Sequence, residues 1–386
     1  MDNTSSVHPE RRAASFDRLR MSGHKSPSDY AELVEAQAEG ERPIAPGRAD
    51  TGKRCLVTGG AGFVGSHLCD RLLADGHSVT VIDSLITGHK KNLAPHARLN
   101  FVEADINDAH IAEYFSGIDW VFHMAALADI VPSMERPAEY HRANVDGTFA
   151  VLEAARAHRV SRLVYTASSS CYGIPDTFPT PETAEVRAMY PYALTKWIGE
   201  QTALHFCKVY QLPVVSLRLF NVYGPRSRSS GTYGAVFGTF LAQKLAGRPL
   251  TVVGDGKQTR DFTYVTDVVD AFVRAAVSNV TGEIFNVGSG GSYAVNELVR
   301  LIGGEIVHIP KRPGEPDCTF ADTARIRQQL KWQPRVKFPD GVRLMLESIE
   351  LWRDAPVWTP DSIAQATESW FRYLGVPKRE ENHGVR

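Results

Sequence analysis

The sequence predicts an α/β protein built on a doubly wound parallel sheet, with a smaller α/β lobe at its C-terminal end. From Arg54 onward, short apolar runs alternate with helical segments, a spacing typical of right-handed crossovers between parallel strands. A glycine-rich turn directly follows the first of these runs. After about residue 220, Gly and Pro become frequent and the apolar runs shorten, so we expect a less regular second lobe there.

The elements of the first part of the chain can be placed in order. The expected buried strands are 54–59, 77–83, 99–105, 119–126 and 161–168. The expected helices are 63–76, which ends at the C-cap glycine Gly76, then 142–160 and 192–209. These elements define a first domain at 53–220, with the alternative that part of 260–290 rejoins it. The second lobe then occupies 221–386.

Both ends of the chain extend beyond this pattern. Residues 1–52 are rich in Ser, Arg, Glu, Pro and Gly, and we expect them to be mostly disordered, apart from a short helix that Ser26 can cap. A misassigned start codon is an alternative explanation of this extension. Near the other end, Thr359 and Pro360 make a good helix start. The apolar edge of that C-terminal helical extension is expected to pack on the second lobe rather than on a partner, and it consists of Trp370, Phe371, Tyr373 and Leu374.

Composition excludes several classes of function. The 43 basic and 44 acidic side chains nearly balance, so no whole-protein field favours nucleic acid or an anionic membrane. No apolar run is long enough to span a bilayer, and the N-terminal arginines are not followed by the apolar stretch of a secretory signal. The five scattered cysteines fit a reducing compartment, and the spacing of the 13 histidines predicts no metal site. We therefore expect a cytoplasmic protein.

The glycine-rich turn indicates a dinucleotide site. In TGGAGFVG, the glycines that keep the turn tight and let a pyrophosphate approach the helix amides are Gly59, Gly62 and Gly65. Asp83 ends the second strand, where a carboxylate can accept both ribose hydroxyls and would repel a 2′-phosphate, so NAD is favoured over NADP. Asp105 and Ile106 follow the third strand and can hold the adenine. The alternative is that these are ordinary turn residues at strand ends.

A tyrosine and a lysine four residues apart, Tyr192 and Lys196 in YPYALTK, are the candidate catalytic pair. On a helix they share one face. An ammonium near a phenol favours the phenolate and lowers its pKa toward neutrality, which makes the tyrosine a usable general base. The lysine can also donate a hydrogen bond to the nicotinamide ribose. Because this spacing also arises by chance, its context decides the assignment.

The ordered set of motifs resembles the extended short-chain dehydrogenases/reductases, and within them the nucleotide-sugar epimerases and dehydratases typified by UDP-glucose 4-epimerase. The set consists of the glycine turn, Asp83, TASSSCYG, YPYALTK and RLFNVYGP, between about Arg54 and Trp332. The resemblance implies a Rossmann domain with NAD, and a homodimer that pairs helices including the one bearing Tyr192. It implies further cofactor contacts from Phe63, Val64, Ala125, Ala126 and Asn144.

The resemblance also gives TASSSCYG a role. Ser168 matches the family's active-site hydroxyl, which binds the sugar 4-hydroxyl and relays its proton to Tyr192. The two positions that follow carry Asp and Glu in 4,6-dehydratases, and decarboxylases carry Glu at the second. Here they are Ser169 and Ser170, so no carboxylate there diverts a 4-keto sugar and its reduction on the other face is favoured. Cys171 is expected to serve packing.

On these grounds the expected activity is an NAD-dependent 4-epimerase acting on a UDP-hexose or UDP-N-acetylhexosamine. One alternative is a UDP-uronate 4-epimerase or another 4-keto-sugar enzyme, and a second is a catalytically silent NAD-binding sensor. The substrate contacts that the resemblance implies are Ser133, Ser168, Ser169, Asn221, Arg260, Arg312, Glu315 and Thr319. Arg260 and Arg312 match diphosphate ligands, and the small Thr319 matches a position that leaves room for a 2-acetamido group. The basic loop 225–229 could meet a uronate carboxylate.

Overall fold

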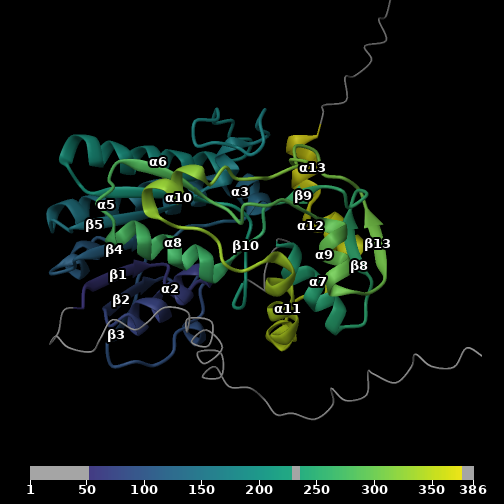
Figure 1. The fold of residues 1–386 in the computed structure, drawn as a ribbon, viewed down its shortest axis with the longest axis horizontal. Helices are drawn as coiled ribbons and strands as arrows, with labels where there is room; N and C mark the ends of the chain where they lie inside the picture. Colours follow the sequence, from purple (N-terminus) through teal and green to yellow (C-terminus); the bar gives the residue numbers. More distant parts are fainter. Residues whose placement is uncertain (1–51, 228–234, 376–386) are drawn as a thin grey trace, which may run out of the picture. The chain divides into compact units, whose positions relative to one another are not determined.

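Residues 52–227 and 235–375 are the ones that the structure, a computed structural model, describes (Figure 1). The predictions for residues 1–51, and for the last two residues of the basic loop, fall outside this part of the chain. Within the described ranges, no helix is both long and apolar enough to cross a bilayer. All five cysteines are free thiols.

A seven-stranded sheet forms the centre of the first domain, in the order β11-β6-β5-β4-β1-β2-β3. Every neighbouring pair in it is parallel. The strands are β1 (Arg54–Thr58), β2 (Ser78–Asp83), β3 (Leu99–Glu103), β4 (Trp120–His123), β5 (Arg162–Ser168), β6 (Val214–Leu219) and β11 (Glu283–Val287). The strand order reverses between β1 and β4, which is where doubly wound sheets bind ligands. The expected doubly wound parallel sheet is therefore confirmed.

Helices cover both faces of this sheet (Figure 1). One face packs under α2 (Phe63–Ala74) and α8 (Val265–Val277), whose apolar side chains share a core with those of β1 and β2. The other face packs under α5 (Gly147–Ala157) and α6 (Pro191–Tyr210), with a separate core. Both β11 and α8 come from beyond residue 260. A late part of the chain therefore returns to the first domain, where it adds one edge strand to the sheet and one helix to the face that α2 covers.

The second lobe has short elements around an aromatic core that includes Tyr223, Phe237, Phe262 and Phe338. Its strands form three pairs: β7 (Val222–Tyr223) with β10 (Thr263–Tyr264), β9 (Thr259–Arg260) with β12 (Tyr293–Ala294), and β8 (Leu250–Val253) with β13 (Ile306–Ile309). The helices beside them are α7 (Val236–Leu245), α9 (Val295–Ile302), α11 (Phe338–Glu347), α12 (Pro360–Ala366) and α13 (Glu368–Leu374). As expected, Thr359 caps α12, in a reciprocal capping box with Ser362.

Shorter helical pieces complete the chain. They are α3 (Ile130–Glu135), α4 (Pro137–His141), α10 (Ala324–Leu330), the π-helical turn η3 (Arg142–Asp146), and the 3₁₀ turns η1 (Lys90–Asn92), η2 (Ile111–Phe115), η4 (Ser169–Tyr172) and η5 (Ile349–Trp352). Two of these matter for the site: α3 carries Ser133, and η4 begins directly after Ser168, at the carboxyl end of β5.

Candidate active site

The glycine turn between β1 and α2 is a tightly packed cradle. Gly59 has a left-handed φ of 71°, and a Cβ there would lie 2.7 Å from the backbone nitrogen of Ala125. A Cβ on Gly65 would lie 2.3 Å from the carbonyl oxygen of Gly59. At the start of α2, Gly62 provides no side-chain cap and the first turn holds no acidic residue, so Phe63 and its neighbours present amides suited to a phosphate.

Two carboxylates lie at the same edge of the sheet. The nearly buried carboxylate of Asp83 accepts hydrogen bonds from the backbone N–H groups of Ala61 (2.9 Å) and Leu85 (2.8 Å), and burial raises its pKa. The Asp105 carboxylate accepts from the backbone N–H of Asn107 at 2.9 Å, and Ile106 beside it is buried. Since β1, β2 and β3 are adjacent and parallel, these groups lie beside the glycine turn, an arrangement that fits the adenosine half of a dinucleotide.

Ser168 and Tyr192 lie together where β5 ends and α6 begins. The Ser168 Oγ accepts hydrogen bonds from the backbone N–H of Ser170 at 3.2 Å and from its hydroxyl at 2.8 Å. Burial raises the pKa of Tyr192, whereas a side-chain hydrogen bond with Ser168 lowers it. The structure thus brings the expected base and its expected proton relay into contact. Cys171 is buried, and that burial raises its thiol pKa to about 12, so it packs as expected.

Lys196 lies one turn further along α6, with 4% of its surface exposed. Its Nζ lies 4.6 Å from the centroid of the Tyr165 ring, and no hydrogen bond from this ammonium is found among the described residues. Burial lowers the pKa of Lys196 to about 7, against the opposing effect of the Glu200 carboxylate. A nearly buried amine of this kind suits the hydroxyls of a nicotinamide ribose, so the residues present fit NAD.

The expectation about the pKa of Tyr192 is wrong for the protein without a bound cofactor. The lysine was expected to lower the pKa of Tyr192, but the net direction is upward. Burial outweighs the hydrogen bond with Ser168, which lowers the pKa of Tyr192, and the carboxylate of Asp129 adds to the rise.

Asn144 and the loop after β4 have protein partners of their own. The Asn144 Oδ1 accepts from the backbone N–H of Leu127 at 2.8 Å, and its Nδ2 donates to the Leu127 carbonyl (3.0 Å) and to Thr195 Oγ1 (3.0 Å). The backbone N–H of Ala125 donates to Thr58 Oγ1 at 3.2 Å. Asn144 therefore ties the loop that contains Ala125 and Ala126 to α6, so that in this structure its amide positions the site.

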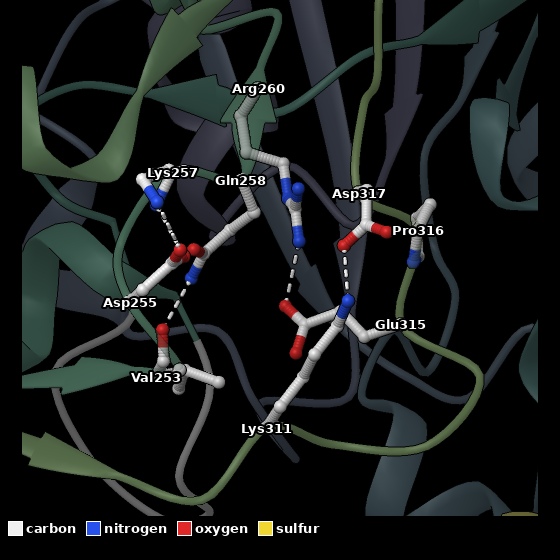
Figure 2. Close-up of a pocket in the computed structure, with 10 residues that line it drawn as sticks. Val253, Asp255, Lys257, Gln258, Arg260, Lys311, Glu315, Pro316 and Asp317 are labelled. Carbon is white, nitrogen blue, oxygen red and sulfur yellow. Dashed lines mark hydrogen bonds and ion pairs between the residues drawn. The ribbon is translucent and has the colours of Figure 1, made fainter.

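The expected diphosphate ligands converge on one carboxylate. Arg260 Nη2 donates to Glu315 Oε1 at 2.7 Å, and Arg312 Nε lies 3.5 Å from Glu315 Oε2. Arg260 and Glu315 line a cavity of about 280 Å³, and Figure 2 shows the Arg260–Glu315 contact between two flanking ion pairs, Lys257 with Asp255 and Lys311 with Asp317. Two guanidinium groups gathered on one side chain suit a ligand with two phosphates.

The remaining predicted substrate residues lie in three places: the Thr319–Asn221 contact, helix α3 and the turn η4. Thr319 Oγ1 donates to Asn221 Oδ1 at 2.7 Å and accepts from the backbone N–H of Asp261 at 3.0 Å, so the structure joins Thr319 and Asn221. Ser133 is fully buried, and its hydroxyl donates to the Ile130 carbonyl of its own helix at 2.6 Å. Ser169 opens η4 beside Ser168. In the basic loop, Arg226 donates to Asp70 Oδ2 of α2 at 2.7 Å.

Comparisons with known proteins agree with this geometry. The sequence profile of the NAD-dependent epimerase/dehydratase family matches residues 55–288. A UDP-glucose 4-epimerase from Mycolicibacterium smegmatis is 40% identical over 309 residues, which cover 76% of this chain and 97% of that protein. The chain belongs to the NAD-dependent epimerase/dehydratase family.

Two solved structures of similar proteins carry ligands. A UDP-N-acetylglucosamine 4-epimerase from Methanobrevibacter ruminantium, in complex with UDP-N-acetylmuramic acid, has a TM-score of 0.73 at 31% identity and covers 77% of this chain and 99% of its own. A UDP-glucuronic acid 4-epimerase from Bacillus cereus, in complex with UDP-glucuronic acid and NAD, has a TM-score of 0.72 at 31% identity, with coverages of 77% and 99%.

Two aromatic residues of this epimerase-family chain were missed by the sequence analysis. Tyr190, just before α6, lies nearly parallel to Tyr192 with ring centroids 6.5 Å apart, although YPYALTK displays both tyrosines. The ring of Trp370 in α13 lies 6.5 Å from that of Tyr190. Trp370 was assigned only to packing, and no local pattern links it to the site.

Across 52–227 and 235–375, no group of three or more His, Cys, Asp or Glu residues is arranged to hold a metal ion.

Proposed function

We propose that this chain is an NAD-dependent nucleotide-sugar 4-epimerase acting on a UDP-hexose or a UDP-N-acetylhexosamine. The observation that carries the proposal is the contact of Ser168 with Tyr192, with serines rather than carboxylates at the two positions that follow Ser168. Ser169 and Ser170 stand where a carboxylate could eliminate water or favour loss of carbon dioxide. A ketone formed beside them has reduction as its favoured outcome.

The residues of the chain divide the proton chemistry between them. The Ser168 hydroxyl accepts a hydrogen bond from the sugar 4-hydroxyl, and Tyr192 takes the proton through Ser168 while C4 is oxidised. NAD⁺ held by the glycine turn and Asp83 would supply the acceptor for the C4 hydride and its donor to the opposite face, and its positive charge would favour the phenolate. Lys196 would hold the nicotinamide ribose. Tyr192 then returns its proton to the C4 oxygen, so no cofactor is consumed.

The substrate class follows from the second lobe. Arg260 and Arg312 bind the diphosphate of the substrate. In this structure both guanidinium groups contact the carboxylate of Glu315. Thr319 leaves room for a 2-acetamido group, which favours UDP-N-acetylhexosamines in addition to hexoses. Among the described residues of the basic loop, Arg226 is engaged by Asp70, which weighs against a uronate.

We also infer a homodimer in the cytoplasm. Large apolar side chains are exposed on α5 and α6, and these are Phe149, Leu194, Val209 and Tyr210. A second copy that packs on these helices would bury them. The five free thiols are consistent with a reducing compartment. Analytical ultracentrifugation tests the dimer, and a protein that sediments only as a monomer would contradict it.

The activity is tested by incubating the purified protein separately with UDP-glucose, UDP-N-acetylglucosamine and UDP-glucuronate, without added cofactor. We expect at least one of the first two to be converted into its C4 epimer until a constant ratio is reached, and the purified epimer to return to the same ratio. A keto sugar, a decarboxylated product or stoichiometric NADH would refute the epimerase. Bound NAD without turnover of any of the three sugars would favour the silent sensor.

The assigned base is tested with Tyr192→Phe. We expect it to lose activity while it still binds NAD. Tyr373→Phe, on the exposed side of α13, is the matched control and keeps wild-type activity. If Tyr192→Phe is as active as the wild type, Tyr192 is not the base.

A further inference from the structure

The segment Arg353–Gly375 follows the last large helix of the second lobe and lies beyond residue 288, where the family match ends. It contains α12 and α13. Figure 1 shows α12 beside the second lobe and α13 near β9 and α3. Its contacts at each end indicate what it does.

The beginning of this segment is anchored to the second lobe. The Gln243 side chain of α7, which is fully buried, donates a hydrogen bond to the carbonyl of Trp358 at 2.8 Å. In α12, Ile363 is buried in one cluster with Val253 of β8 and Ile309 of β13. The segment therefore starts from the strands beside the cavity of Figure 2.

The end of the segment is anchored to the first domain. In α13, Ser369 Oγ donates to Glu135 Oε1 at the end of α3, 2.7 Å away. Leu374 lies beside the loop 312–314, since a Cβ on Gly314 would come within 3.7 Å of its Cδ1 and 3.0 Å of Met189 Cε. The loop that carries Arg312 is thus held between α13 and the residues that lead into α6.

Trp370 is the centre of these contacts, with 5% of its surface exposed. Its indole N–H donates to the carbonyl of Pro313 at 2.6 Å. The guanidinium carbon of Arg312 lies 5.2 Å from the indole ring centroid, within cation–π distance. On another side lies Tyr190, which stacks with Tyr192.

We propose that Trp370 is a positioning residue of the substrate site, through which the C-terminal segment fixes Arg312 for the nucleotide diphosphate. An aromatic face restricts a guanidinium to one plane and leaves its N–H fork directed to the ligand, so less rotational entropy is lost on binding. The hydrogen bond to Pro313 fixes the backbone of the same loop. This proposal rests on the proposed function, because it requires Arg312 to contact a diphosphate.

The test compares binding of UDP and of uridine to the NAD-bound full-length protein by titration calorimetry, alongside steady-state kinetics. For Trp370→Leu we expect the dissociation constant of UDP to rise by about 3- to 30-fold, the range for loss of a cation–π contact. The constant for uridine stays within about twofold of wild type, and so does the constant for NAD, measured on the NAD-free protein. KM for the UDP-sugar rises in parallel with the UDP constant, whereas kcat changes little.

Two further variants separate positioning from simple packing. Trp370→Phe keeps an aromatic face for Arg312, and we expect it to recover UDP affinity to within about threefold of wild type. Tyr373→Leu, on the same helix but 58% exposed, is the matched control and leaves all three constants unchanged. A Trp370→Leu protein that binds UDP as tightly as wild type overturns the proposal. An equal loss for UDP, uridine and NAD also overturns it, because a general loss of structure acts on all ligands.

Arg312→Leu keeps the outcomes distinguishable. If the wild type binds UDP and epimerises, and Arg312→Leu weakens UDP but Trp370→Leu does not, only the positioning proposal fails. If Arg312→Leu leaves UDP binding unchanged, the diphosphate role assigned to Arg312 fails, and the positioning proposal fails with it. If the wild type does not bind UDP, the proposed substrate class itself is wrong.

Discussion

The buried ion pair beneath α6 offers the sharpest test of how the catalytic helix is held. Glu200 lies one turn beyond Lys196 on α6, and the side chains of Glu200 and Arg218 are 1% and 3% exposed. The Arg218 guanidinium donates to both carboxylate oxygens, with Nη2–Oε1 at 2.5 Å and Nε–Oε2 at 3.0 Å. Ser216 Oγ donates to Oε2 at 2.9 Å. Both oxygens of the Glu200 carboxylate therefore accept hydrogen bonds from side chains of β6, and these contacts hold α6 against that strand.

Glu200→Gln preserves the shape of this side chain and removes its charge. The Arg218 guanidinium then stays buried without a counter-ion, which costs about 3–5 kcal/mol of stability in pairs of this kind. Because the Glu200 carboxylate raises the pKa of Lys196, its loss also moves that pKa further below its present value of about 7. We expect a lower urea midpoint at an unchanged m-value.

The double variant Glu200→Gln/Arg218→Met is expected to recover much of the lost stability, since it leaves no uncompensated charge. Glu350→Gln removes half of an exposed ion pair with Arg353 and should change stability by less than about 1 kcal/mol. A Glu200→Gln protein destabilised by less than about 1 kcal/mol would refute the claim that the buried Arg218 guanidinium depends on the Glu200 carboxylate.

Three further predictions concern the site directly. Ser168→Ala should lower kcat by about 100-fold or more while NAD binding is unchanged, and a variant within about threefold of wild type would remove Ser168 from the proton path. Thr319→Tyr should fill the space beside Asn221, so kcat/KM should fall far more for UDP-N-acetylglucosamine than for UDP-glucose, and equal losses would contradict this specificity role. Lys196 binds a proton less readily in the folded protein (pKa about 7) than in the unfolded chain (10.5), so its contribution to stability grows as pH rises from about 7 to 10. Urea midpoints at pH 7 and 9 should therefore rise less, or fall more, for Lys196→Met than for wild type, and identical changes would contradict the lowered pKa.

The sequence predicts those strands and helices whose apolar residues form a pattern within one short segment of the chain. Strands β1 and β4 are almost entirely buried, because helices cover both faces of a parallel sheet, and each of β1 to β5 contains apolar residues between turn and helix signals. The strand of the large sheet that comes latest in the chain, β11, has five residues among glycine-rich turns and pairs with β6, which lies about 70 residues earlier. Its partner depends on long-range pairing, so the sequence indicates only that part of 260–290 may rejoin the sheet.

The candidate site divides in the same way. Tyr192 and Lys196 are four residues apart on α6, so once the segment is recognised as helical the sequence predicts that they share one face. The pairing of Thr319 with Asn221 crosses 98 positions, and the placement of Trp370 under Arg312 crosses nearly 60. The hydrophobic periodicity of a helix or strand cannot predict contacts between residues so far apart in the chain. The direction of the Tyr192 pKa was mispredicted for a related reason, since it depends on burial by the whole fold rather than on one neighbouring charge.

Tyr190 connects the two ends of the substrate site. It precedes α6 directly and stacks with the proposed base Tyr192, and its ring lies 6.5 Å from that of Trp370, the side chain proposed to position Arg312. Re-reduction on the opposite face requires the keto sugar to turn while its diphosphate stays bound. A rigid connection between the base and the diphosphate site suits this requirement, because both groups stay in place while the sugar turns. The serines at positions 169 and 170 add no carboxylate that would divert the keto sugar meanwhile.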